Sequence, residues 1–250
     1  MKSQVETIIR CKKCEYDFNP QNQNDTTCPM CLDEEIIKIK NLKEQTLHPE
    51  KILVAWNLPI KHLNSSFDTY EGGNEIKKFL REAVQDRQDI LLCGKTGCGK
   101  THLSAAMLRE KIITSTDLFS SHRNINRQYQ GCDGSPSYFI TVPELLFEIR
   151  KTYNDKEISE QEIVDKYSSV ELLVLDDLGA EKTSEWVEST LYLIIDRRNR
   201  NEKWTIVTSN LTLDEIEVHL GARIASRLSD MKVVNIKLPD YRKKRKALHA

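Results

Sequence analysis

The hydrophobic positions of this 250-residue chain alternate between short apolar runs and longer stretches with helical spacing. Five short runs of aliphatic and β-branched residues predict strands, at 90–93, 138–141, 171–175, 204–208 and 232–236. Stretches with apolar residues three and four positions apart predict helices, at 100–111, 143–153, 185–199, 212–219 and 222–229. Because strands and helices alternate, we expect an α/β fold in which helices cover both faces of a parallel five-stranded sheet.

Two stretches depart from this alternation. Residues 114–137 are polar and contain Gly131, Gly134 and Pro136, which predicts a long surface loop. Residues 33–47 are rich in charged residues and predict a connecting helix. We therefore expect a small module at 1–31, a helical linker at 32–51 and a large domain at 52–250.

A sequence of the form G-x-x-x-x-G-K-T follows the first predicted strand and opens the next helix. Its residues are Gly94, Lys95, Thr96, Gly97, Cys98, Gly99, Lys100 and Thr101. Glycines let backbone N–H groups turn inward and surround phosphates, at the positive end of the following helix. Lys100 is expected to reach the β- and γ-phosphates of ATP, and the Thr101 hydroxyl to hold Mg²⁺. The alternative is a plain glycine-rich turn, which a second nucleotide motif downstream disfavours.

The second motif is a pair of carboxylates, Asp176 and Asp177, directly after the apolar run 172–175. Such a run is typical of a central parallel strand, whose carboxyl end is where open α/β sheets bind ligands. We expect Asp176 to bind Mg²⁺ through its water shell and Asp177 to orient or deprotonate the attacking water. The alternative is a pair of helix-capping aspartates. Asn210, at the end of the strand 204–208, either contacts the γ-phosphate or its water, or forms a turn.

Charge and hydropathy limit the possible partners and location. The chain has 37 Lys and Arg against 38 Asp and Glu, so its net charge is close to zero. The net charge therefore gives no indication of nucleic-acid binding. The basic run at 241–246 is either a solvated end or a phosphate contact. No apolar run is long enough to span a bilayer and no signal peptide is evident, so we expect a cytoplasmic protein with reduced cysteines.

Four of the seven cysteines form two C-x-x-C pairs, Cys11 with Cys14 and Cys28 with Cys31. Two such pairs at this separation predict a tetrahedral structural zinc ion, which would supply the folding free energy of the small module. The alternatives are a redox pair or disulfides, and the lack of a βαβ context together with a reducing compartment argues against both. Cys93, Cys98 and Cys132 are not expected to bind the metal.

In order and spacing, these motifs resemble the AAA+ helicase loaders of the DnaC/DnaI type and the related IstB transposition ATPases. The resemblance covers about residues 52–245 and includes further segments at 57–60, 66–70, 139–141, 144–146, 221–228 and 240–242. It implies an AAA+ P-loop ATPase core without a C-terminal helical lid. An N-terminal zinc module is similar to the DnaI arrangement, where that domain grips the replicative helicase.

The resemblance also implies partners and further site residues. It implies loading of a hexameric DnaB-type replicative helicase onto single-stranded DNA by a homo-oligomer in the ATP state. Asn210 then corresponds to sensor 1, and Arg227 is favoured as the arginine finger, with Arg223 second. The alternative for either arginine is a surface ion pair. Arg150 and Lys151, on the predicted helix 143–153, are then DNA contacts or plain surface charges.

Two other functions fit the same motifs. The first is an IstB-like transposition helper ATPase that binds target DNA and a transposase. The second is a zinc-dependent adaptor that binds nucleotide with little turnover. The zinc module favours the loader, and the intact set of Lys100, Asp176 and Asn210 favours turnover.

Overall fold

The computed structural model describes residues 9–10, 12, 17–18, 49–119, 137–154 and 158–241. The chain divides into two compact units, Met1–His48 and Pro49–Ala250. In the first unit, the short strands β1 (Ile9–Arg10) and β2 (Asp17–Phe18) pair antiparallel. The helix predicted at 33–47 lies outside the described residues, and the boundaries predicted at residues 31 and 51 stay predictions.

The second unit is built on a sheet of five parallel strands, as predicted. The strands are β3 (Ile90–Gly94), β4 (Ser137–Thr141), β5 (Leu172–Leu178), β6 (Trp204–Ser209) and β7 (Lys232–Ile236). Their spatial order is β4-β5-β6-β3-β7. The strand before the predicted phosphate loop, β3, therefore lies beside β6, and β5 lies on the other side of β6. This order brings the ends of β3, β5 and β6 to one edge of the sheet.

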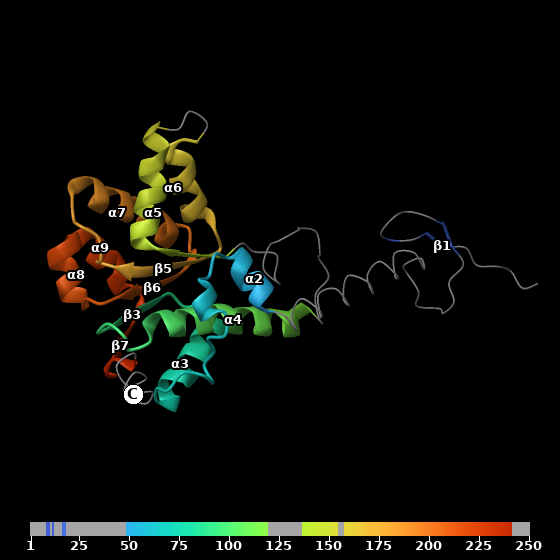
Figure 1. The fold of residues 1–250 in the computed structure, drawn as a ribbon. Helices are drawn as coiled ribbons and strands as arrows, with labels where there is room; N and C mark the ends of the chain where they lie inside the picture. The colour runs from blue at the N-terminus through green and yellow to red at the C-terminus, as the bar shows by residue number, and fades with distance from the viewer. Residues whose placement is uncertain are drawn as a thin grey trace, which may run out of the picture. The chain divides into compact units, whose positions relative to one another are not determined.

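Helices cover both faces of the sheet (Figure 1). One face carries α2 (Pro49–Ala55), α3 (Asn74–Gln85) and α4 (Lys100–Phe119). The other carries α5 (Val142–Lys151), α6 (Glu160–Ser169), α7 (Glu185–Arg200), α8 (Leu213–Leu220) and α9 (Ala222–Ser229). The described residues of this unit also form two 3₁₀ turns, η1 (Ile60–His62) and η2 (Thr152–Asn154). Among the helices described, none combines the length and the apolar character needed to cross a membrane.

Successive strand residues point to opposite faces and so enter two separate cores. Leu91 packs with the α5–α9 helices, whereas its neighbours Ile90 and Leu92 pack with α2–α4, and all three are fully buried. On β5, Leu173 and Val174 divide in the same way. Burial on both faces explains why these strands are continuous apolar runs.

Capping boxes fix the starts of several helices. At α5, the Thr141 hydroxyl accepts a hydrogen bond from the Glu144 amide, and the Glu144 carboxylate accepts one from the Thr141 amide. Ser159 and Glu162 cap α6 in the same way. Each pair satisfies two backbone donors that the helix itself leaves free. These sequence signals mark α6, which the periodicity analysis did not predict.

The loop predicted at 114–137 is wrong at its beginning, because α4 continues to Phe119. Thr114 is accommodated in the helix since its hydroxyl donates to the carbonyl of Glu110, at 2.9 Å. A threonine whose hydroxyl bonds to the preceding turn can therefore lie inside a helix, although its polar, β-branched side chain predicts a helix end. Residues 120–136 lie outside the described residues.

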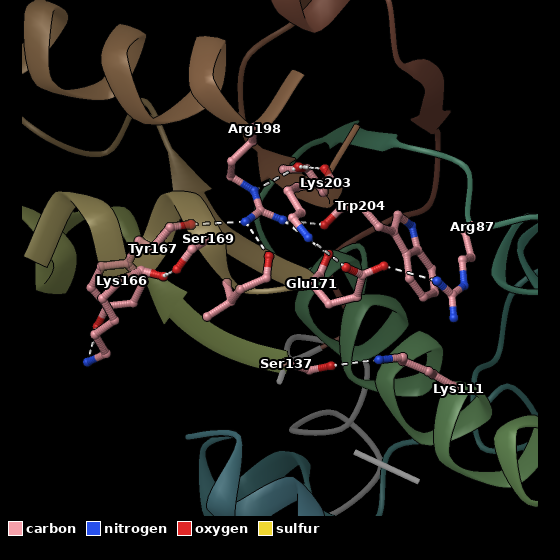
Figure 2. A network of polar contacts seen from close by, with 12 residues as sticks. Arg87, Lys111, Ser137, Lys166, Tyr167, Ser169, Glu171, Arg198, Lys203 and Trp204 are labelled. Carbon is pink, nitrogen blue, oxygen red and sulfur yellow. Dashed lines mark hydrogen bonds and ion pairs between the residues drawn. The ribbon is translucent and has the colours of Figure 1, made fainter. Parts of the chain in front are cut away.

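A buried arginine ties together the amino ends of β5 and β6 (Figure 2). Arg198 of α7 is 0% exposed, and its guanidinium donates to the carbonyls of Tyr167, Val170 and Trp204 and to the Thr205 hydroxyl. Burial lowers its pKa to about 10, so it stays protonated at neutral pH. This network lies at the edge of the sheet opposite to the predicted site.

Candidate nucleotide-binding site

The predicted phosphate loop connects β3 to the first turn of α4. Gly97 has φ of 82° and Gly99 has φ of 96°, a region in which residues with a side chain are strained. A Cβ on Gly97 would lie 1.9 Å from an Asp240 carboxylate oxygen, and one on Gly99 would lie 2.6 Å from the Tyr70 ring. Backbone conformation therefore favours glycine at both positions, and the packing of the Tyr70 ring adds to this at Gly99.

Lys100 folds back along this loop. Its side chain is nearly buried, and its ammonium group lies 2.7 Å from the Gly94 carbonyl and 2.8 Å from Asn210 Oδ1. Asn210 also accepts a hydrogen bond from the Thr96 hydroxyl, at 3.4 Å. The structure thus brings together the loop lysine and the amide at the end of β6, two residues separated by 110 positions in the sequence.

Thr101 and Asp176 meet beside this lysine. The Thr101 hydroxyl donates to Asp176 Oδ2 at 3.0 Å, and Asp176 is only 3% exposed. Burial raises the pKa of Asp176 to about 6, with a smaller contribution from the neighbouring charge of Asp177. A hydroxyl and a buried carboxylate are oxygen ligands of the kind that Mg²⁺ prefers, so this pair fits the expected cation.

Asp177 has a different environment from its neighbour. Asp177 lines the pocket that contains the loop, whereas Asp176 is buried and is not among the residues that line this pocket. Its backbone is left-handed, with φ of 58°, and its amide donates to the Thr208 hydroxyl at 3.0 Å. The two consecutive carboxylates are thereby separated into a buried one beside Thr101 and an accessible one facing the pocket.

The pocket has a volume of about 500 Å³. Lys100, Thr101, Asp177 and Asn210 all line it, together with the loop residues 96–99. A metal ion or nucleotide would enter a space in which a lysine, a hydroxyl and a carboxylate converge. This convergence is what binding of a Mg²⁺-triphosphate requires.

Two walls of the pocket come from segments to which the sequence analysis assigned no role in the site. The segment before α3 contributes Tyr70, whose hydroxyl donates to the Cys98 carbonyl at 3.2 Å. The segment after β7 contributes Tyr241, whose amide donates to the Gly97 carbonyl at 3.0 Å. Both segments belong to the resemblance described above. Their contact with the loop arises only on folding.

The two candidate finger arginines lie on α9. Arg227 Nε donates to Asp196 Oδ1 of α7 at 2.9 Å, and Arg223 is exposed. Neither side chain lines the pocket formed by the described residues. An intramolecular ion pair therefore exists for the favoured candidate, and the choice between the two arginines stays a prediction.

Aromatic and basic side chains gather around the end of α5. Phe147 is 61% exposed and Tyr153 is 59% exposed. The Lys151 ammonium lies 4.6 Å from the centre of the Phe147 ring, and the Arg150 guanidinium lies 4.7 Å from that of Trp186. We call these five residues the aromatic-basic surface. This surface includes Arg150 and Lys151, the two basic residues of the predicted DNA-contact helix.

The four cysteines of the predicted zinc module lie outside the described residues, as does Cys132. Cys93 and Cys98 are buried in the second unit. Burial raises the pKa of the Cys93 thiol to about 11, so it stays protonated at neutral pH. Residues 242–246 of the basic run also lie outside the described residues.

Comparison with known proteins shows the family to which this part of the chain belongs. Residues 78–249 match the family described as IstB-like ATP binding protein. The replicative helicase loader DnaC of Escherichia coli (strain K12) is 25% identical in an alignment of 175 residues that covers 67% of this chain and 64% of that protein. The chain thus spans slightly less than two thirds of the length of that relative.

Two solved structures share the fold. A crystal structure of the DnaC helicase loader superposes with a TM-score of 0.58 at 24% identity, covering 72% of this chain and all of that one. The AMPPCP-bound DnaA from Aquifex aeolicus superposes with a TM-score of 0.55 at 19% identity, covering 77% and 57%. The second unit therefore has the fold of an AAA+ P-loop ATPase.

Proposed function

Because the chain belongs to the IstB-like ATP binding protein family, we propose that it is an ATPase that loads a replicative DNA helicase onto single-stranded DNA. The observation that carries this proposal is its similarity, over the folded ATPase unit, to a protein named as a replicative helicase loader. In this role ATP binding and hydrolysis act as a switch, and a cytoplasmic location follows from the role.

The pocket supports binding and hydrolysis of ATP. The loop amides and Lys100 bind the triphosphate, and Thr101 with Asp176 holds Mg²⁺, which when bound neutralises phosphate charge. Asp177 faces the pocket, where it orients the attacking water and accepts its proton. Asn210, held 2.8 Å from Lys100, aligns that water or the γ-phosphate.

The aromatic-basic surface supports binding of single-stranded DNA. Unpaired bases stack on exposed aromatic rings, and basic side chains contact the phosphates. Phe147 offers an exposed ring with the ammonium of Lys151 beside it. This combination suits a single strand better than a duplex, whose bases are already stacked.

The cysteine module is proposed to bind zinc and to grip the helicase. The support is the spacing of Cys11, Cys14, Cys28 and Cys31 in the sequence. Metal analysis of the purified chain should find a single zinc ion, and Cys11→Ser with Cys14→Ser should remove it. A metal-free wild-type chain would contradict the zinc proposal and leave the ATPase proposal untouched.

A transposition helper is the second candidate. The observation that favours it is the family description itself, which refers to IstB. Such a protein would bind a transposase in place of a helicase, with the same ATP pocket. The two candidates differ in their partner, so a partner experiment separates them.

The deciding experiment is capture of a purified replicative helicase by the full-length chain, with ATP, with ADP and without nucleotide. We expect the wild-type chain to capture the helicase to an extent that depends on the nucleotide present. Lys100→Ala should lose this dependence, and the double cysteine variant should lose capture. Absence of capture under all three conditions would contradict the loader and favour the transposition helper. An ATP turnover assay on the same samples separates both from an adaptor with little turnover.

A further inference from the structure

The strand that carries both site aspartates is irregular at that point. Leu175 of β5 pairs with Val207 of β6, and the next paired residues are Leu178 and Ser209. Two residues of β5, Asp176 and Asp177, therefore lie opposite a single residue of β6, Thr208. This register shift has the two-to-one count of a β-bulge, and we refer to it as the bulge; such a shift changes the direction of the side chains next to it.

Thr208 makes contact with both aspartates across the bulge. Its hydroxyl donates to Asp176 Oδ1 at 2.7 Å and accepts a hydrogen bond from the Asp177 amide at 3.0 Å. The residue is 0% exposed, so water does not replace either bond. One hydroxyl thus uses its donor and its acceptor on two consecutive residues.

These bonds fix the direction of both carboxylates. Asp176 accepts from Thr101 on Oδ2 and from Thr208 on Oδ1, so its carboxylate cannot rotate without losing one of them. Asp177 adopts a left-handed backbone that costs free energy unless its surroundings hold it. The hydrogen bond from the Asp177 amide to the Thr208 hydroxyl is one such restraint. With this left-handed backbone, Asp177 lines the pocket.

We propose that Thr208 is a positioning residue for hydrolysis, which holds the bulge so that Asp176 faces Thr101 while Asp177 faces the pocket. This inference rests on the proposed ATPase function and adds a residue that does not itself contact the nucleotide. Its effect falls on the alignment of the attacking water, because misalignment slows a reaction more than it weakens binding.

Three variants of the full-length chain test the proposal. Thr208→Val keeps the shape and removes the hydroxyl, and Thr208→Ser restores the hydroxyl. Thr205→Val is the matched control, because it removes a buried hydroxyl from the opposite end of β6, where Thr205 accepts from Arg198. Thermal unfolding of each variant confirms that it is folded before activity is compared.

Two readouts are needed. In steady-state ATP hydrolysis, we expect Thr208→Val to lower kcat about tenfold to a hundredfold while KM changes by less than about threefold. In amide hydrogen exchange without nucleotide, the Asp177 amide should be protected in the wild type and exchange faster in Thr208→Val. Thr208→Ser should recover both properties, and Thr205→Val should keep wild-type kcat per folded molecule.

The outcomes separate this inference from the function on which it rests. Wild-type turnover with unchanged kcat in Thr208→Val overturns the role of Thr208 and leaves the ATPase proposal standing. If the wild type itself does not turn over ATP, the ATPase proposal fails. The exchange experiment then decides alone, and equal protection of the Asp177 amide in the wild type and Thr208→Val overturns the positioning role.

Discussion

Lys100 Nζ lies 2.8 Å from Asn210 Oδ1 and so connects the phosphate-binding loop to the end of β6. The ammonium group also donates to the carbonyls of Gly94 and Lys95. Its donors are therefore directed at oxygen acceptors of the protein itself. Binding of phosphates requires Lys100 to exchange these neutral acceptors for charged ones.

Lys100→Ala should abolish measurable ATP binding. A hydrogen bond to a charged group contributes about 1.5–3 kcal/mol, so loss of two phosphate contacts weakens binding by about a hundredfold or more. Titration calorimetry with ATP and Mg²⁺ measures the loss. Lys203→Ala is the control, since Lys203 pairs with Glu171 at the opposite edge of the sheet. Equal affinity in the Lys100 variant and the wild type would refute the assignment of this loop.

Asp176→Asn should stabilise the nucleotide-free protein at neutral pH. The pKa of Asp176 rises from 3.8 to about 6 on folding, so keeping it ionised in the folded state costs at most about 3 kcal/mol. This free-energy cost is fully present above about pH 6, where the carboxyl is ionised in both the folded and the unfolded state. As the pH falls below 6, the carboxyl is protonated in the folded state and the cost decreases. It disappears near pH 4, where the carboxyl becomes protonated in the unfolded state as well.

The test is thermal unfolding of both proteins across this pH range without Mg²⁺. We expect the variant to have the higher Tm at pH 7.5 and the two Tm values to converge towards pH 4. A variant that is less stable than the wild type at pH 7.5 would show that the lost hydrogen-bond acceptor outweighs the removed charge. The same variant should lose the Mg²⁺ dependence of ATP binding.

Arg227→Ala should bind ATP but fail to hydrolyse it in an assembly. The variant should remain folded, because Asp196 keeps a second partner in Arg200, at 2.8 Å. Arg200→Ala is therefore a matched control that removes the other arginine from the same carboxylate and should retain turnover.

A mixing experiment tests whether the arginine acts on a neighbouring subunit. Lys100→Ala subunits lack an ATP site but carry Arg227, and Arg227→Ala subunits carry the site. We expect the mixture to hydrolyse ATP although neither variant does so alone. A silent mixture would direct attention to Arg223, which is exposed and is tested in the same way.

Phe147→Ala should weaken binding of single-stranded DNA. Stacking of a base on an aromatic side chain contributes about 1–3 kcal/mol, which corresponds to roughly a fivefold to a hundredfold loss of affinity. Because Phe147 is 61% exposed, its removal should leave Tm nearly unchanged. Fluorescence anisotropy with a labelled oligonucleotide measures the affinity. Val218→Ala, at a residue of α8 that is 90% exposed, is the control. Unchanged DNA affinity in the Phe147 variant would contradict the proposal that the aromatic-basic surface binds single-stranded DNA.

The sequence predicts best those parts of the site whose residues are consecutive in the chain. The phosphate loop and the pair Asp176–Asp177 are local patterns, and both lie at the expected edge of the sheet. The contribution of Tyr70 could not be derived from pattern, because it reaches the loop through its packing against Gly99. Thr208 was part of a predicted strand, but the bulge opposite it leaves no trace in the apolar run before Asp176.

The burial of Arg198 is a second feature that the sequence pattern does not predict. Arg198 belongs to a basic stretch at the end of α7, with Arg197 and Arg200, which is typical of a solvated helix end. The structure buries it completely, whereas Arg197 and Arg200 form ion pairs at the surface. The acceptors of Arg198 include backbone carbonyls of Tyr167, Val170 and Trp204, which come together only in the folded structure, so the sequence does not show them.

The buried guanidinium of Arg198 also bears on how the protein folds. Its acceptors belong to the end of α6, the turn before β5 and the start of β6, and none of these segments satisfies it alone. An intermediate in which one of them is missing would leave a desolvated cation without its partners, at a cost of several kcal/mol. We therefore expect α6, α7 and the amino ends of β5 and β6 to gain and lose their structure together.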